Sequence, residues 1–200
     1  MLGADSEAGT PGPDGRHRRR ERSRALIVDS ALALLHEHGR LPSARAVAER
    51  AGLTERTLFN LFEDKDALML AALSAFRQEA LARMPTVEQG CALQERVRRF
   101  FEALAPLMDD YARMRWAAAT SSAEVPDLER RVVLRTLHRR VFELFELSGT
   151  DLRASPVTAA AVRAAVDPLT WRIYRVQQRL SISASRDAMM NSVLALSGAR

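Results

Sequence analysis

The segment from residue 43 to residue 65, SARAVAERAGLTERTLFNLFEDK, constrains the fold more than any other part of the chain. Apolar residues recur at helical spacing on both sides of Gly52, and Ser43 and Thr54 stand where two short helices would be capped. Gly52 tolerates the left-handed backbone that a tight turn between helices needs. The pattern predicts a helix-turn-helix, whose second helix can lie in the major groove of DNA. An ordinary helical hairpin within a bundle is the alternative that this segment leaves open.

Lys65 is the one lysine among the 30 lysine and arginine residues of the chain. We expect it in the first turn of a further helix capped by Asp64, where the helix dipole disfavours a cation by ~0.3–1 kcal/mol. Asp64 and Asp66 can offset that penalty, but an external phosphate would offset it better and would also use the free amides of the helix start. We therefore expect Lys65 to contact a DNA phosphate. A solvated surface lysine is the alternative.

The composition favours an all-α protein. Apolar residues make up 47% of the chain, glycines number nine, and alanine, leucine, arginine and glutamate are frequent. The single Cys91 excludes an internal disulfide and has no second cysteine or nearby histidine for a metal site. No glycine-rich phosphate loop or paired nucleophile and base is present, so we expect no enzyme, no cofactor and no metal. Without a signal peptide or an apolar run near ~20 residues, we expect a cytoplasmic chain with no membrane contact.

Positive charge is densest around the helix-turn-helix. Residues 1–15 hold three acids and no base, and residues 16–65 hold eleven bases and seven acids, a net charge of +4. Residues 66–200 also carry +4, from nineteen bases and fifteen acids, but over more than twice the length. Such a concentration of positive charge is expected where nucleic acid is met.

The chain divides into three parts by composition. Residues 1–15 are glycine, proline and small polar residues and are expected to form a disordered tail. Residues 16–70 form the predicted helix-turn-helix DNA-binding domain, which opens with an arginine run at 16–24 that is either a solvated arm or an arm on DNA. Residues 71–200 are expected to form a second, helical domain.

Apolar periodicity and capping residues predict the individual helices. The expected ranges are about 22–38, 43–51, 54–62, 65–83, 93–108, 109–119, 126–147, 155–182 and 185–196. Pro168 should kink or divide the helix predicted at 155–182. The architecture is thus a three-helix headpiece followed by a helical body.

Order and spacing within residues 22–70 resemble the TetR family of bacterial transcriptional regulators. The matching residues are Ile27, Ala31, Leu34, Leu35, Gly39, Val47, Ala48, Ala51, Gly52, Leu53, Thr57, Leu58, Phe59, Phe62, Lys65 and Leu68. The resemblance implies the headpiece fold, a homodimer and a ligand-binding helical body. In the remaining two thirds it rests on the helix count, Trp171 and the segments 173–175 and 180–182.

The resemblance also implies which side chains meet DNA. By position, the phosphate contacts would be Ser43, Thr57, Asn60 and Lys65. The base-reading group would be Arg45, Glu55, Arg56 and Thr57. Arginine can pair bidentately with guanine and glutamate can accept from cytosine, so the side-chain chemistry agrees. Glu55 has an alternative role, because a carboxylate near a helix N-terminus stabilises the helix dipole.

The body is expected to hold an apolar small-molecule effector. The candidate cavity residues are Phe101, Met108, Tyr111, Met114, Trp116 and Trp171, with Arg113 or Arg115 available for an anionic group. The same residues could instead be plain core or dimer interface. Five alanines within 155–182 and the apolar residues of the last helix predict that these two helices pair with their copies in a four-helix dimer interface.

These expectations combine into one function. We predict a DNA-binding transcriptional regulator, a homodimeric repressor that binds an inverted-repeat operator in double-stranded DNA and is released by its effector. The alternative is a helical dimer that binds a small molecule or a protein without DNA-binding activity. Retention on heparin or nonspecific DNA that falls with salt distinguishes the two.

Overall fold

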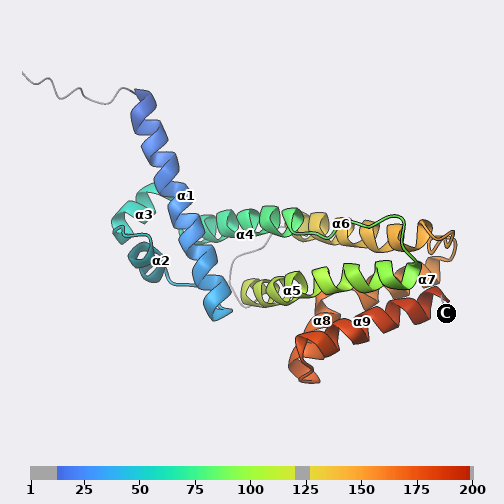
Figure 1. Ribbon diagram of the computed structural model, residues 1–200. Helices are drawn as coiled ribbons and strands as arrows, with labels where there is room; N and C mark the ends of the chain where they lie inside the picture. Colours follow the sequence, from blue (N-terminus) through green and yellow to red (C-terminus); the bar gives the residue numbers. More distant parts are fainter. Residues whose placement is uncertain (1–12, 120–126, 199–200) are drawn as a thin grey trace, which may run out of the picture.

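All regular elements in the computed structural model, which describes residues 13–119 and 127–198, are helices (Figure 1). In chain order they are α1 Pro13–His38, α2 Ala44–Arg50, α3 Glu55–Leu61, α4 Lys65–Ala82, α5 Leu93–Ala119, α6 Asp127–Glu146, α7 Pro156–Ala165, α8 Pro168–Arg172, the π-helix η1 Ile173–Gln177 and α9 Ile182–Ser197. The all-α prediction is confirmed. Of the predicted features, tail residues 1–12 and the helix start at Pro126 lie outside the described residues.

A small apolar core holds the headpiece together. It gathers side chains of α1, α2, α3 and the first turns of α4, among them Ile27, Val47, Leu58 and Phe62, each at most 1% exposed. Small Ala48 lets α2 pack closely within this core. Helix α4 then leaves the headpiece and runs into the body, so the two parts share one continuous helix (Figure 1).

The body surrounds a second, larger core. Helix α5 lies between α4 and α6 on one side and α8 and α9 on the other, as Figure 1 shows. Trp171, Phe101 and Phe145 are among its largest fully buried side chains. The C-terminal end of α1 also packs on α5, so the headpiece touches the body through α1 as well as through α4.

Helix α1 starts earlier than the sequence predicted. The expected helix at 22–38 begins at Pro13, which includes the last residues of the predicted tail at 1–15. Proline is preorganised for a first helical position and arginine is a good helix former, so the arginine run continues the helix instead of forming a loose arm. A contact of 3.0 Å between His17 and Glu21, one turn apart, supports the extension.

The two helices predicted at 93–108 and 109–119 are one continuous helix, α5. Pro106 lies inside it and removes one backbone hydrogen-bond donor. Apolar residues on both sides of Pro106 bury the same face in the body core, and this packing outweighs the local proline penalty.

Pro168 divides the stretch predicted at 155–182, as expected, and it opens α8. The last helix begins at Ile182 rather than at about Ser185, because the Ser181 hydroxyl accepts a hydrogen bond from the backbone N–H of Ala184 at 3.1 Å. Ser185 is instead fully buried within α9.

Candidate functional site

Two side-chain caps define the helix-turn-helix. The Ser43 hydroxyl accepts a hydrogen bond from the Ala46 N–H at 3.2 Å, and the Thr54 hydroxyl accepts one from the Thr57 N–H at 3.2 Å. Between the helices, Gly52 has a φ of +66°, which an L side chain rarely adopts. The predicted caps and turn are therefore present, and they fix the start of α3.

Helix α3 is sharply two-sided. Leu58 is fully buried in the headpiece core, whereas Glu55 in the first turn and Arg56 and Asn60 on the outer face are exposed. Thr57 is half-buried, and its hydroxyl lies 2.9 Å from the Thr54 hydroxyl. Three of the predicted DNA contacts thus face solvent from one helix, while the Thr57 hydroxyl already has a protein partner.

Arg45 presents a further cation from α2. Its Nε donates to Glu49 at 2.8 Å, and this hydrogen bond, together with the charges of Glu49 and Glu55, raises the pKa of Arg45. Glu55 of α3 is therefore near enough to Arg45 of α2 to act on its charge. To contact a base, Arg45 would have to give up its ion pair with Glu49. That pair is exposed to solvent and therefore weak.

Ser43 and Lys65 share a crevice of about 300 Å³ beside the helix-turn-helix. Its other polar lining residues are His38 and Arg40, which the sequence analysis did not single out. Lys65 is exposed on the first turn of α4, whose start is capped by Asp64 through a 2.7 Å hydrogen bond from the Ala67 N–H. The crevice therefore gathers cationic and hydroxyl groups of the kind that contact a phosphate.

Arg24 anchors α1 against the end of α3. Its guanidinium donates to the Leu61 carbonyl at 2.8 Å and lies 4.1 Å from the centre of the Phe62 ring. Beyond this contact, the first turns of α1 carry exposed arginines and project past α3 in Figure 1. The arginine run is thus an extension of the surface that carries α3.

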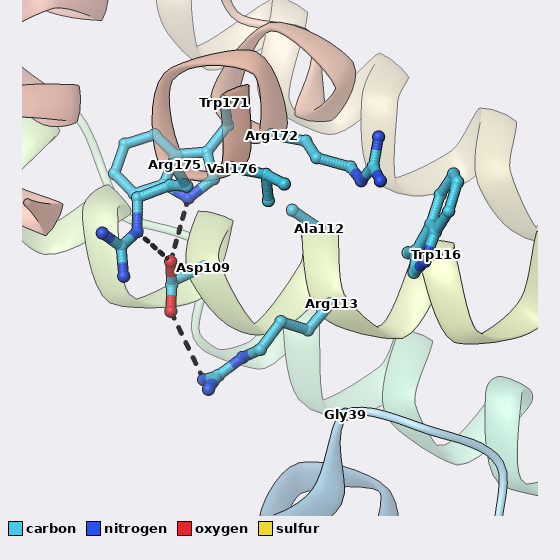
Figure 2. A pocket seen from close by; sticks show the side chains of 9 residues that line it. All are labelled: Gly39, Asp109, Ala112, Arg113, Trp116, Trp171, Arg172, Arg175 and Val176. Atoms are coloured by element: carbon cyan, nitrogen blue, oxygen red, sulfur yellow. Dashed lines mark hydrogen bonds and ion pairs between the residues drawn. The ribbon is translucent and has the colours of Figure 1, made fainter. Parts of the chain in front are cut away.

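A second candidate site is a cavity of about 240 Å³ in the body, next to the headpiece (Figure 2). It is lined by Gly39, Asp109, Ala112, Arg113, Trp116, Trp171, Arg172, Arg175 and Val176. The structure brings together two predicted ligand residues, Trp116 and Trp171, with the predicted cation Arg113. Asp109, Arg172 and Arg175 were missed, because they meet only where α5 crosses α8 and η1.

Asp109 ties these elements together. One of its carboxylate oxygens accepts from Trp171 Nε1 at 3.2 Å and from Arg175 Nε at 2.8 Å, and the other lies 3.5 Å from Arg113 (Figure 2). Because the carboxylate is largely buried, these donors offset the desolvation that an unpaired charge would suffer. One side chain of α5 therefore holds α8 and η1 against the cavity.

The other predicted ligand residues do not line this cavity. Phe101, Met108, Tyr111 and Met114 are at most 6% exposed and pack in the body core. The cavity residues of α5 follow the spacing 109, 112, 113 and 116, which is a different face of the same helix. The prediction therefore merged two faces of α5, one core and one cavity. The side chain of Arg115 lies outside what the structure describes.

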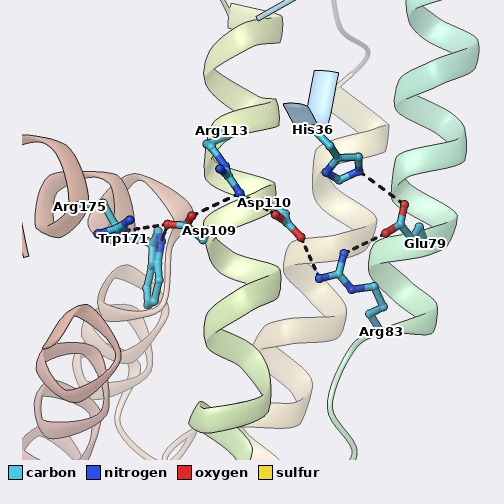
Figure 3. Close-up of polar contacts among 8 residues, drawn as sticks. All are labelled: His36, Glu79, Arg83, Asp109, Asp110, Arg113, Trp171 and Arg175. Atoms are coloured by element: carbon cyan, nitrogen blue, oxygen red, sulfur yellow. Dashed lines mark hydrogen bonds and ion pairs between the residues drawn. The ribbon is translucent and has the colours of Figure 1, made fainter. Parts of the chain in front are cut away.

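A chain of polar contacts, three ion pairs and one histidine–carboxylate contact, leads from the cavity toward the headpiece (Figure 3). The links are Arg113 to Asp110 at 2.9 Å, Asp110 to Arg83 at 2.8 Å, Arg83 to Glu79 at 2.9 Å and Glu79 to His36 at 3.7 Å. They join α5 to α4 and α4 to α1. The cavity is thereby connected by polar contacts to both helices that enter the headpiece.

Two consecutive residues after α1 line the body cavity and the crevice, one each. Gly39 lies on the wall of the body cavity, and Arg40 lies on the wall of the crevice with Ser43 and Lys65. Gly39 has a φ of +60°, and a Cβ at this position would lie 4.0 Å from Arg113. The turn after α1 is therefore a wall common to both sites.

Membrane-spanning helices and metal clusters are both absent from residues 13–119 and 127–198. No helix there is long and apolar enough to cross a membrane. No three histidine, cysteine, aspartate or glutamate residues there gather where they could hold a metal ion. Cys91 is half-buried and free.

The headpiece matches a known protein family. Residues 27–72 match the family described as bacterial regulatory proteins, tetR family. An HTH-type transcriptional regulator of Mycobacterium tuberculosis strain H37Rv, itself uncharacterized, is 30% identical over 148 residues, which cover 69% of this chain and 63% of that protein. The chain therefore spans less than two thirds of the length of this relative.

Solved structures share the fold at lower identity. A transcriptional regulator from Rhodococcus sp. Rha1 superposes with a TM-score of 0.62 at 24% identity, covering 88% of this chain and 95% of that chain. A transcriptional regulator from Pseudomonas aeruginosa PAO1 gives 0.61 at 19% identity, covering 90% and 92%. A TetR family transcription regulator from Marinobacter aquaeolei VT8 gives 0.58 at 19%, covering 88% and 97%.

Proposed function

This chain belongs, through residues 27–72, to the tetR family of bacterial regulatory proteins, and from that premise we propose that it is a transcriptional repressor. In this proposal it acts in the cytoplasm as a homodimer, binds an inverted-repeat operator in double-stranded DNA, and leaves that DNA when a small molecule fills the body cavity. The exposed side of α3, with Glu55, Arg56 and Asn60, is the observation that carries the proposal.

The DNA contacts divide by chemistry. Arg56, Glu55 and Arg45 read base edges in the major groove, since arginine and glutamate match the donor and acceptor patterns there. Ser43, Lys65 and the crevice between them take a phosphate of the flanking backbone. Asn60 contacts a further phosphate, and the exposed arginines of α1 add sequence-independent attraction.

Selection of binding sites from random DNA tests this function. The proposal expects an inverted repeat whose half-sites lie about one helical turn, or a multiple of it, apart. It also expects retention on heparin that falls with salt. A protein that binds neither heparin nor DNA at low salt would favour the alternative, a helical dimer that binds only a small molecule or a protein.

The dimer is proposed to form through α7 and α9. These helices pack on one another and expose apolar residues, among them Val157 at 79% and Leu196 at 40%. Small Ala160 and Ala164 are also exposed on α7, which allows a second copy to approach closely. Trp171 is buried inside the body instead and does not belong to this surface. Light scattering that gives a monomer of 22.3 kDa at micromolar concentration would exclude the dimer.

Release is proposed to pass through the turn after α1 and through α4. A ligand in the cavity touches the wall formed by Gly39 and the ion pairs of Asp109 and Arg113. It weakens DNA binding only if it prefers the arrangement without DNA, and a coupling of ~1–3 kcal/mol is typical. Titration of a bound ligand into the operator complex tests the coupling. Unchanged DNA affinity at saturation would refute it, and tighter binding would make the ligand a corepressor.

A further inference from the structure

We propose that the body cavity takes a small planar carboxylate, such as an aromatic carboxylic acid, and that Arg172 is the residue that recognises its charge. This inference deepens the proposed function, because it names the chemical class of the effector for the cavity beside the headpiece. It also assigns to Arg172 the anion contact that the sequence analysis placed at Arg113 or Arg115, beside an otherwise apolar surface.

The charge of the cavity wall favours an anion. Three arginines, Arg113, Arg172 and Arg175, and one carboxylate residue, Asp109, contribute to its lining, although most of the lining surface is apolar. Asp109 pairs with Arg113 and Arg175, and Arg113 also pairs with Asp110. No carboxylate in the described part of the chain pairs with Arg172. The uncompensated positive charge therefore resides on Arg172.

Arg172 lies over the ring of Trp116. Its guanidinium carbon lies 3.5 Å from the centre of the Trp116 ring, close enough for the flat group to stack on the indole (Figure 2). Stacking uses the face of a guanidinium and leaves its N–H edge available. A carboxylate can approach that edge and accept two parallel hydrogen bonds without displacing the ring.

The remaining surface fits a small flat apolar group. Ala112, Val176 and the largely buried ring of Trp171 line the cavity beside Arg172. Its volume of about 240 Å³ is below the range of about 300–1,000 Å³ that is typical of sites for drug-sized ligands. A single ring with a carboxylate is therefore better matched than a long acyl chain.

Binding of benzoate tests the proposal, with benzamide and benzylamine as neutral and cationic probes of similar shape. The chain has two tryptophans, Trp116 and Trp171, and both line the cavity, so intrinsic fluorescence reports on this site. We expect benzoate to change the tryptophan emission and to raise the melting temperature, and to bind about tenfold more tightly than benzamide. Equal affinity for the three probes, or no benzoate binding up to the millimolar range, would overturn the assignment.

Variants of Arg172 locate the carboxylate. Arg172→Gln should weaken benzoate binding about tenfold and leave benzamide unaffected, and Arg172→Lys should fall between, because lysine keeps the charge without the planar fork. Arg139→Gln removes an exposed arginine of α6 and should change neither affinity. The melting temperature of each variant without ligand controls for folding. Benzoate binding that survives both Arg172 variants would overturn the role of Arg172.

DNA binding is measured separately, by retention on heparin and by operator affinity with and without benzoate. Benzoate that binds through Arg172 without weakening operator binding would support the ligand class and contradict release. Release by neutral compounds in the absence of benzoate binding would support the regulator and overturn the ligand class. The two proposals can therefore fail independently.

Discussion

The headpiece and the body present their candidate sites in opposite ways. In the headpiece, Glu55, Arg56 and Asn60 project into solvent from a helix whose other face is buried. In the body, Asp109 and Trp171 are buried and hold helices together while they line the cavity. An exposed residue of the headpiece can therefore change with little effect on folding, whereas a change at Asp109 alters packing and binding at once.

The strongest test of this difference is to shorten a buried side chain in the headpiece and, separately, one in the body. Leu58→Ala should lower headpiece stability by ~2–5 kcal/mol, because Leu58 is fully buried and leaves a cavity. DNA binding should be abolished while the unfolding transition of the body, followed by tryptophan fluorescence, persists. Leu144→Ala, equally buried but in the body core, is the matched control and should lower that transition instead. Disappearance of both signals together in each variant would show that the parts fold as one unit.

Asp109→Asn tests whether the cavity wall is also structural. The amide keeps a partner for Trp171 but removes the charge that faces Arg175 and Arg113, so we expect a loss of stability of ~1–3 kcal/mol. Urea unfolding followed by tryptophan fluorescence measures the change. The exposed Glu102→Gln, which removes a surface pair with Arg98, should have little effect by comparison. An Asp109 variant as stable as the parent would mean that binding and packing are separable in the body too.

Arg56→Ala should leave folding intact, because the side chain is exposed. If Arg56 reads a base, the variant loses ~1–3 kcal/mol of operator binding and relaxes preference at one position in each half-site. Affinities for operator and random DNA, measured at one salt concentration, decide between the outcomes. An equal loss on both DNAs would assign Arg56 to the phosphate backbone.

Lys65→Ala should give the smallest effect and a different signature. If Lys65 binds a phosphate, its removal weakens binding to all DNA sequences alike and reduces the slope of log affinity against log salt by about one. Salt titrations with operator and random DNA measure this slope. A weakening confined to the operator would contradict the division between base-reading and phosphate-binding residues.

The sequence was most informative where a site is built from neighbouring residues. The caps at Ser43 and Thr54 and the turn at Gly52 depend on hydrogen bonds within one or two turns, so their spacing alone predicts them. The pairing of Arg172 with Trp116 depends on how α5 crosses α8, and no local pattern encodes that crossing. The continuity of α5 through Pro106 was missed for a related reason, since tertiary packing there outweighs local propensity.

The turn formed by Gly39 and Arg40 has a consequence for the exchange of parts between regulators. A chimera that takes residues 13–70 from this chain and its body from another protein would carry the DNA-reading helices. It would also carry Gly39, a piece of the cavity wall, into a body whose residue facing position 39 is no longer Arg113. The boundary between reading DNA and sensing a molecule therefore does not coincide with a single cut in the chain. Swapped headpieces should be paired with the residues of α5 that face them.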